Sequence, residues 1–224
     1  MRHIKKGKEP KVLTDHKKDG NTLYKGLNIT DIQQQLLQEQ RGLCAYCMCR
    51  IDAIAGRTPN MQVEHVKCRT NYPDDELEYV NMLGVCFGGE KNNMMQPHCD
   101  KSKDKGEVHY ELRKLDPLNI AVESMLTFLP TGTVVAVNND KDVIMDIKAL
   151  NLNEMYTRIN REKISQSIKE EYKIVCKSEN KAKVIQFLEK NLIKWTSCNK
   201  NGFLPEYNIV AIKFLKKKLA HLNK

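Results

Sequence analysis

Cysteines gather in the middle of this 224-residue chain, where six of the eight fall between residues 44 and 99. Cys44 and Cys47 form a Cys-x-x-Cys pair, the spacing at which two thiolates reach one tetrahedral ion at about 2.3 Å. Cys86 and Cys99 form a wider second pair, and the loop between them can still close on a metal because closure entropy grows slowly with length. The sequence therefore predicts a structural zinc ion bound by these four thiols.

Other side chains compete for those positions. Cys49 and Cys68 lie in the same segment, and His98 can replace Cys99 because imidazole also binds zinc. Cys176 and Cys198 stand apart in helix-like surroundings, so we predict that they only fill space. With no export signal, the clustered thiols indicate metal binding rather than disulfides.

A second chemical signal is the pair Glu64-His65 in the stretch QVEHVKC, which otherwise alternates like a strand. Adjacent strand residues point to opposite faces, so the two are not both routine surface residues if the strand covers a core. At a strand end beside a cleft, a carboxylate can bind a hard cation such as Mg²⁺ while a neutral imidazole accepts a proton from water. This division of labour suits hydrolysis.

Hydrophobic periodicity predicts the elements that position these residues. We expect a helix over residues 30–41, with capping-box spacing at Thr30 and Gln33 and a glycine, Gly42, to end it. Short strands and loops are expected over 44–100, a short helix over 99–105, and two strands joined by a Thr131-Gly132 turn over 125–137. Beyond these, we predict helices over residues 152–175, 185–195 and 207–219.

These elements indicate an α+β fold with a mainly helical C-terminal region. We divide the chain into a basic N-terminal arm (1–27), a cysteine-rich core (28–118) and a β-hairpin followed by helices (119–224). The arm has few apolar residues, so it is expected to order only on binding. Helix stripes of this kind are ordinary core-facing surfaces rather than active-site walls.

Charge adds a clue to the partner. The net charge is +9, with eight Lys or Arg against three acids in residues 1–25 and five Lys without an acid in residues 213–224. Basic ends attract polyanions, which favours nucleic acid; a solvated surface is the competing interpretation. The sequence contains neither a membrane-length apolar run nor a secretory signal, so we expect a cytoplasmic protein without membrane contact.

Four elements recur here in the order of a known family. Cys44/Cys47, Glu64-His65, Asn81-Met-Leu running to Cys86, and Cys99-Asp100-Lys-Ser-Lys103 resemble the HNH, or ββα-metal, endonucleases. The resemblance covers residues 42–118. The segment Leu115-Asp116-Pro117-Leu118, with the strand pair and helices after it, is similar to the PtuB-type HNH nuclease of Septu and retron-associated antiphage systems.

The resemblance implies a role for each matching residue. His65 would be the general base, and Glu64 and Asp100 would bind a catalytic Mg²⁺ or Mn²⁺. Asn81 would fix the loop that orients His65, and Lys103 would face a phosphate of the nucleic acid. Cys44, Cys47, Cys86 and Cys99 would bind the structural zinc in a ββα-metal core.

Two departures from the family pattern leave alternatives open. The third position is Asp100 where the family often has His or Asn, so His98 is an alternative ligand. The insertion before Cys99 also carries Glu90, Asn92 and Asn93, each able to reach the metal or the nucleic acid.

The resemblance further implies DNA or RNA as the substrate, an ATPase of the PtuA type as partner, and an assembly with a retron reverse transcriptase and its DNA product. The alternative function is a non-catalytic zinc-containing subunit that binds nucleic acid or docks onto another protein. Glu64-His65 with Asn81 and Asp100 discriminates between them, because binding alone does not require these residues.

Overall fold

The computed structural model describes residues 1–52, 60–89, 96–103 and 109–222. The fold is α+β, with two small antiparallel sheets, β1–β2 and β3–β4. The helices are α1 (Lys11–Lys18), α2 (Thr30–Glu39), α3 (Asp100–Lys103), α4 (Val122–Met125), α5 (Lys141–Ala149), α6 (Met155–Cys176), α7 (Lys181–Thr196) and α8 (Asn208–Leu222). The strands are β1 (Gln62–His65), β2 (Met82–Val85), β3 (Leu126–Phe128) and β4 (Val134–Ala136).

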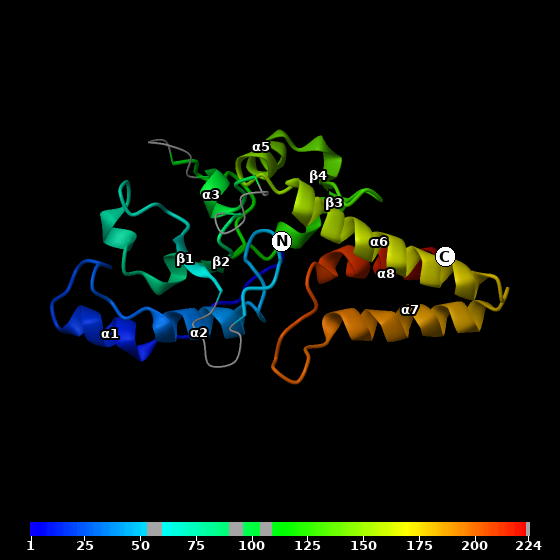
Figure 1. The fold of residues 1–224 in the computed structure, drawn as a ribbon, viewed down its shortest axis with the longest axis horizontal. Coiled ribbons are helices and arrows are strands. Elements are labelled where there is room, and N and C mark those ends of the chain that lie inside the picture. Colours follow the sequence, from blue (N-terminus) through cyan, green and yellow to red (C-terminus); the bar gives the residue numbers. More distant parts are fainter. Residues whose placement is uncertain (53–59, 90–95, 104–108, 223–224) are drawn as a thin grey trace.

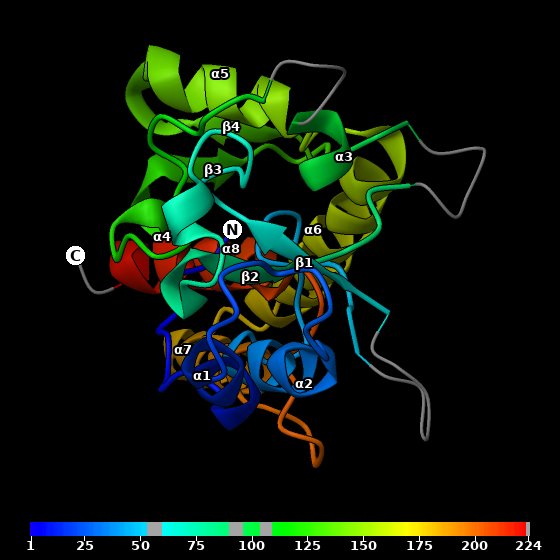
Figure 2. The same cartoon turned by 90° about the vertical axis from the view of Figure 1, so that its left-hand side faces the viewer.

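The hairpin of β1 and β2 lies at the centre of the cysteine-rich part, between α2 and α3 (Figures 1 and 2). Its register pairs Glu64 with Leu83 and His65 with Met82. All four residues of β2 are buried, so this strand is covered on both faces. Helix α2 covers part of the hairpin and delivers the chain to the first cysteine pair.

Helix α2 confirms the predicted element but not its predicted cap. The helix begins after Ile29, whose side chain offers no hydrogen-bond acceptor, and the N–H of Thr30 is instead satisfied by Asn28 Oδ1 at 3.1 Å. At the other end Gly42 has a φ of 76°, a conformation that costs a glycine little. A Cβ there would also lie 2.6 Å from the guanidinium of Arg50.

The N-terminal arm differs from the sequence-based expectation, because residues 1–27 are packed against the core. Met1, Ile4 and Leu13 are buried in the largest apolar cluster, and the N–H of Ile4 donates to the carbonyl of Pro117 at 2.8 Å. Residues 11–18 form α1, of which only Leu13 is buried. A few apolar side chains are enough to order this arm, because they are buried against a core that the rest of the chain forms.

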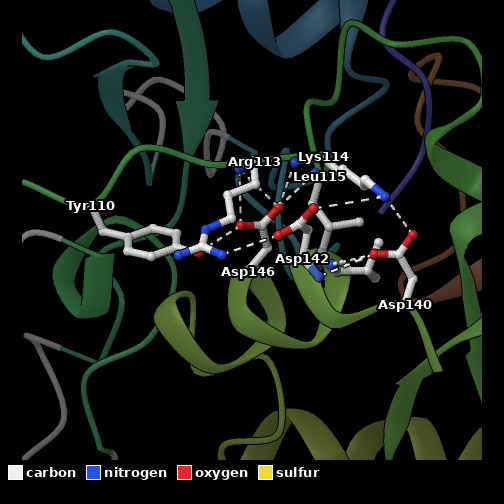
Figure 3. A network of polar contacts seen from close by, with 8 residues as sticks. Tyr110, Arg113, Lys114, Leu115, Asp140, Asp142 and Asp146 are labelled. Carbon is white, nitrogen blue, oxygen red and sulfur yellow. Dashed lines mark hydrogen bonds and ion pairs between the residues drawn. The ribbon is translucent and has the colours of Figure 1, made fainter.

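Strands β3 and β4 form the predicted hairpin, and helix α5, which periodicity did not indicate, packs against β4. The buried carboxylate of Asp146 in α5 accepts hydrogen bonds from the backbone N–H groups of Arg113, Lys114 and Leu115 and from the hydroxyl of Tyr110, at 2.8 to 3.1 Å (Figure 3). One carboxylate thus anchors residues 110–115 onto α5.

Helices α6, α7 and α8 pack together and extend away from the sheets (Figure 1). Ile168, Val184, Leu188 and Leu215 form their buried centre, which confirms the predicted helical C-terminal region. A second apolar cluster joins the start of α8 to the segment around Leu43 and Met48. In the part of the chain that the structure describes, no helix combines the length and apolarity that crossing a bilayer demands.

The Asp146 network gives a first prediction. In Asp146→Asn an amide N–H₂ must face backbone N–H donors in a site with no access to water, so we expect the free energy of unfolding to fall by roughly 2–4 kcal/mol. Asp142→Asn is the matched control, because its ion pair with Arg113 is exposed and such pairs add little to stability. Urea unfolding of both variants measures the difference, and equal losses would contradict the assigned role.

Candidate functional site

Four buried thiols lie around one point in the structure. Cys44, Cys47, Cys86 and Cys99 bring their Sγ atoms within 4.8 Å of one another. The Sγ atoms are 3.9 Å apart for Cys44 and Cys99, 3.7 Å for Cys47 and Cys86, and 3.8 Å for Cys86 and Cys99. Four sulfurs at tetrahedral bond lengths from Zn²⁺ would be separated by about 3.8 Å. The four cysteines therefore fit a structural zinc ion, as their spacing predicts.

The surroundings favour ionised sulfur at Cys44 and Cys86, whereas the pKa values of Cys47 and Cys99 are raised. Burial raises the pKa of Cys44, but hydrogen bonds from the neighbouring thiols outweigh it and hold the value well below the ordinary one. The backbone N–H of Cys86 also donates to Cys44 Sγ at 3.4 Å. Such outer contacts orient ligands and stabilise their charge.

The competing zinc ligands take other places. The imidazole Nε2 of His98 lies 3.5 Å from Cys86 Sγ, so this side chain contacts the thiol group from outside rather than joining Glu64 and Asp100. Cys49 lies two residues after Cys47, and Cys68 follows β1. Neither belongs to the four-thiol group found among the described residues. Cys176 is partly buried in the helical bundle, whereas Cys198 is exposed and therefore fills no core position.

Glu64 sits on the face of β1 that is directed toward α3. Its carboxylate accepts a hydrogen bond from the hydroxyl of Tyr46 at 3.1 Å and forms a buried ion pair with Lys103. Burial, and then the adjacent carboxyl of Asp100, raise the pKa of Glu64 well above its ordinary value. Because burial disfavours the charged form, a carboxylate here needs a cation beside it.

Asp100, the first residue of α3, completes a pair of carboxyl groups. Its Oδ2 accepts from the side-chain amide of Gln62 at 2.7 Å, and its Oδ1 is buried without a hydrogen-bond partner among the described residues. Gln62 and Glu64 share one face of β1, because they are two positions apart. Two close carboxyl groups with an unsatisfied oxygen fit a hard divalent cation, which needs few protein ligands when a phosphate supplies others.

Lys103 differs from the sequence-based expectation that it faces a phosphate. Its side chain is only 2% exposed and its ammonium pairs with Glu64. A buried carboxylate without a partner would be costly, so Lys103 provides the compensating charge. In this arrangement its ammonium is directed into the protein and not toward a nucleic acid.

His65 occupies the opposite face of β1, with different neighbours. Its Nε2 lies 3.0 Å from the carbonyl oxygen of Glu76, and its ring packs edge-on against Tyr24 with centroids 4.8 Å apart. A carbonyl oxygen only accepts, so Nε2 carries the proton and Nδ1 keeps its lone pair. Burial lowers the pKa of His65 to about 4, which leaves the imidazole neutral at pH 7.

The imidazole and the two carboxyl groups are near one another but do not touch. No hydrogen bond joins His65 to Glu64 or Asp100 in the described part of the chain, although the Asp100 charge is close enough to act on the pKa of His65 and raise it. Strand alternation separates the two side chains at the backbone. The structure therefore brings Glu64 together with Asp100 and Lys103, and places His65 on the other side of the strand end.

Asn81 closes the loop that follows His65. Its Oδ1 accepts from the N–H of Lys67 at 2.8 Å, and its Nδ2 donates to the carbonyls of Lys67 and Asp75 at 3.0 and 3.1 Å. The carbonyl of Asn81 also accepts from the N–H of Val66. This side chain thus fixes both ends of the segment that carries Glu76, the partner of His65.

Sequence reasoning missed three neighbours of the site. Gln62 could have been found from alternation, since it shares the face of Glu64. Tyr46 lies inside the Cys-x-x-Cys pair, so the same turn that positions the thiols positions its hydroxyl. Tyr24 gives no local signal, because its contact with His65 spans 41 residues of chain. The proposed ligands Glu90, Asn92 and Asn93 lie outside the described residues.

The thiol group predicts a metal content and a stability. We expect about one zinc per chain, and Cys44→Ser or Cys86→Ser should lose most of it and unfold at a lower temperature, because a structural ion contributes directly to folding. Elemental analysis and thermal unfolding measure both. Cys176→Ser is the control and should keep its zinc; loss of zinc in that variant would overturn the partition of the cysteines.

His65 predicts how stability depends on pH. The pKa is about 4 in the folded chain against 6.5 for a free histidine, so the unfolded state binds more protons in this window and stability falls as pH falls. Between pH 7 and pH 5 the protein should lose about 2 kcal/mol more than His65→Gln, which has no titrating ring. Denaturant unfolding at the two pH values, without added divalent ions, provides the test. Parallel losses in both proteins would show that His65 is not buried neutral.

Comparison with known proteins gives no match, either to a family model or to a curated protein. The described residues themselves show an α+β chain in which four buried cysteines can hold a zinc ion. They also place the carboxyl group of Glu64 in β1 beside that of Asp100 in α3, and the imidazole of His65, whose pKa burial lowers, at the end of β1.

Proposed function

We propose that this chain is a divalent-metal-dependent endonuclease of the HNH type, which hydrolyses phosphodiester bonds of DNA or RNA. The observation that carries the proposal is the adjoining carboxyl groups of buried Glu64 and partly buried Asp100, with a histidine that is neutral at pH 7 on the other side of the strand end. Asp100 Oδ1, buried without a partner among the described residues, is an oxygen that a cation would satisfy. The order of sequence motifs supports the same conclusion.

The two carboxyl groups would hold the catalytic ion. A Mg²⁺ or Mn²⁺ ion bound by Glu64 and Asp100 would supply positive charge for the phosphate oxygens as negative charge develops on them. Lys103 pairs with Glu64, so it is the cation that a divalent ion would replace at this carboxylate. Gln62 holds Asp100 in place through its amide.

His65 would act as the general base. The hydrogen bond to Glu76 fixes the proton on Nε2 and leaves Nδ1 free to take a proton from the attacking water. A lowered pKa keeps this nitrogen unprotonated through the neutral range. Asn81 is a positioning residue, because it ties the loop that carries the carbonyl of Glu76.

A role in antiphage defence belongs to the same proposal. The PtuB-like layout of residues 115–118 and of the hairpin and helices after them supports it, as does the exposed, lysine-rich surface of α8. The partner would be an ATPase of the PtuA type, with a retron reverse transcriptase and its DNA as a further component.

One observation favours the alternative, a zinc-containing subunit that binds nucleic acid or docks onto a protein without cutting. His65 is only 8% exposed, and Lys103 already neutralises Glu64. A centre arranged in this way is inactive until the carboxylate exchanges its partner and the imidazole becomes accessible.

Cleavage by the purified, zinc-loaded chain separates the two functions. Plasmid DNA and total RNA are incubated with and without added Mg²⁺ or Mn²⁺, and we expect cleavage only with the added ion. His65→Gln preserves a donor for the Glu76 carbonyl but cannot act as a base, so its rate should fall by roughly 10²–10⁴-fold. Electrophoresis of the products and a filter-binding assay record cutting and binding together.

The control is His221→Ala, which removes an exposed imidazole at the end of α8 and should keep the full rate. Equal cleavage by the wild type and His65→Gln would refute His65 as the base. Binding without cleavage under every ionic condition would instead establish the non-catalytic alternative.

A further inference from the structure

A cavity of about 640 Å³ opens beside the turn that carries Cys44. Residues 2–7 form one wall. The end of α2 and residues 41–48 form a second wall, and the segment after α7 forms the third. Glu64, His65 and Asp100 are not among its lining residues. The cavity is therefore separate from the proposed catalytic centre.

The lining carries more positive than negative charge. Arg2, Lys5, Lys6 and Arg41 face a single acidic residue, Glu39. Lys6 already neutralises that acid, because its ammonium lies 3.3 Å from the Glu39 carboxylate. The same ammonium donates to the carbonyl of Met82 at 2.9 Å and lies over the ring of Tyr79. Three cationic side chains are left without an acid inside the cavity.

Those three side chains have unused hydrogen-bonding capacity. The Nε of Arg2 pairs with Glu123 at 3.5 Å, but its Nη1 is buried without a hydrogen-bond partner among the described residues. Lys5 and Arg41 are exposed and form no ion pair within the described ranges. A buried guanidinium nitrogen without an acceptor is costly, so Arg2 would gain a hydrogen bond by turning this nitrogen toward an anion that enters the cavity.

The chemistry of the walls identifies the anion. Arginine forks match the geometry of phosphate oxygens, and lysine adds a point charge that phosphates commonly bind. Among the described residues the lining includes no Phe, Tyr or Trp, so it offers no aromatic platform on which a base could stack. Recognition here would be of phosphate and not of base identity.

We propose that this cavity is a phosphate-binding site that takes the phosphate groups of a nucleotide or of a nucleic-acid strand. The site goes beyond the proposed nuclease centre and does not depend on it, since the two share no residue. A nucleotide would fill the cavity as a discrete ligand, whereas a strand would lay consecutive phosphates past Arg2, Lys5 and Arg41.

Binding by the full-length, zinc-loaded chain tests the site without added divalent ions, so that no strand is cut. A fluorescent 12-nucleotide single strand is titrated by anisotropy, and ATP and pyrophosphate serve as competitors and as separate ligands. The double variant Lys5→Gln/Arg41→Gln changes only exposed side chains and should fold. We expect it to weaken binding of the phosphate ligand roughly tenfold.

The matched control removes two exposed lysines outside the basic ends of the chain, Lys181→Gln/Lys183→Gln in the first turn of α7, and loses the same charge. It should bind within about twofold of the wild type. Equal weakening of binding by both double variants would show that binding depends on net charge and not on the cavity, and would overturn the site. No weakening by the cavity double, or competition by a poly-glutamate peptide but not by pyrophosphate, would also overturn it.

A second readout uses Cys198, an exposed thiol that lines the cavity. Pyrophosphate or ATP should slow the modification of Cys198 by a thiol reagent in the wild type but not in Lys5→Gln/Arg41→Gln, with Cys198→Ser identifying the labelled residue. Tight competition by ATP assigns a nucleotide, and affinity that rises with oligonucleotide length assigns a strand. Both readouts omit the divalent ion that cleavage requires and measure binding alone, so failure of the nuclease proposal and failure of this one are distinguishable.

Discussion

The convergence of four thiols on one point is the constraint on which the rest of the core depends. Cys44 and Cys47 follow α2, Cys86 follows β2, and Cys99 precedes α3, so a single ion would join three segments that are distant in sequence. The span between the two outer ligands is 55 residues. A metal ion would join these segments in addition to the apolar side chains, such as Tyr46, Met82 and Leu83, that they bury in the largest cluster.

The same constraint positions the polar residues beside the thiols. Tyr46 lies between the first two cysteines and donates to Glu64, and Asp100 follows the last cysteine directly. Arg161 of α6 donates to the carbonyls of Gly132 and Leu152. Burial lowers the pKa of its guanidinium, and the charges of Cys47 and Cys99 act in the opposite direction. Four thiolates on Zn²⁺ leave two negative charges, and a buried arginine nearby offsets part of them.

The sequence predicted those parts of the fold that depend on the spacing of residues close to one another in the chain. The cysteine spacing predicted the thiol group because a tight turn fixes two ligands and a long loop can return the others. Helical periodicity predicted α6, α7 and α8 because their buried stripes are long. Glu64-His65 stood out because an acid and an imidazole interrupt a strand pattern, and the structure places both in buried positions.

The remaining features depend on contacts that no local pattern contains. Asp146 resembles any acid on a helix until three backbone N–H groups from residues 113–115 are brought to it. In the sequence Lys103 looks like a surface lysine in a basic stretch. In the structure its ammonium is buried, because it pairs with the buried carboxylate of Glu64 in a distant segment. The arm of residues 1–27 contains too few apolar side chains to fold alone, yet Ile4 and Leu13 find a surface on the core that receives them.

The N-terminal region therefore takes part in the site as well as in the core. Tyr24 packs edge-on against the ring of His65. The backbone N–H of Tyr24 donates to the carboxylate of Glu76 at 3.0 Å, and the backbone carbonyl of Glu76 accepts the hydrogen bond from the imidazole. Arg69 stacks on the same tyrosine ring and pairs with Glu76. His65 is thus oriented from two sides, by the loop that Asn81 ties and by a segment anchored through Ile4 and Leu13. Access to Nδ1 is consequently a property of how residues 1–27 pack, because the imidazole has almost no exposed surface of its own.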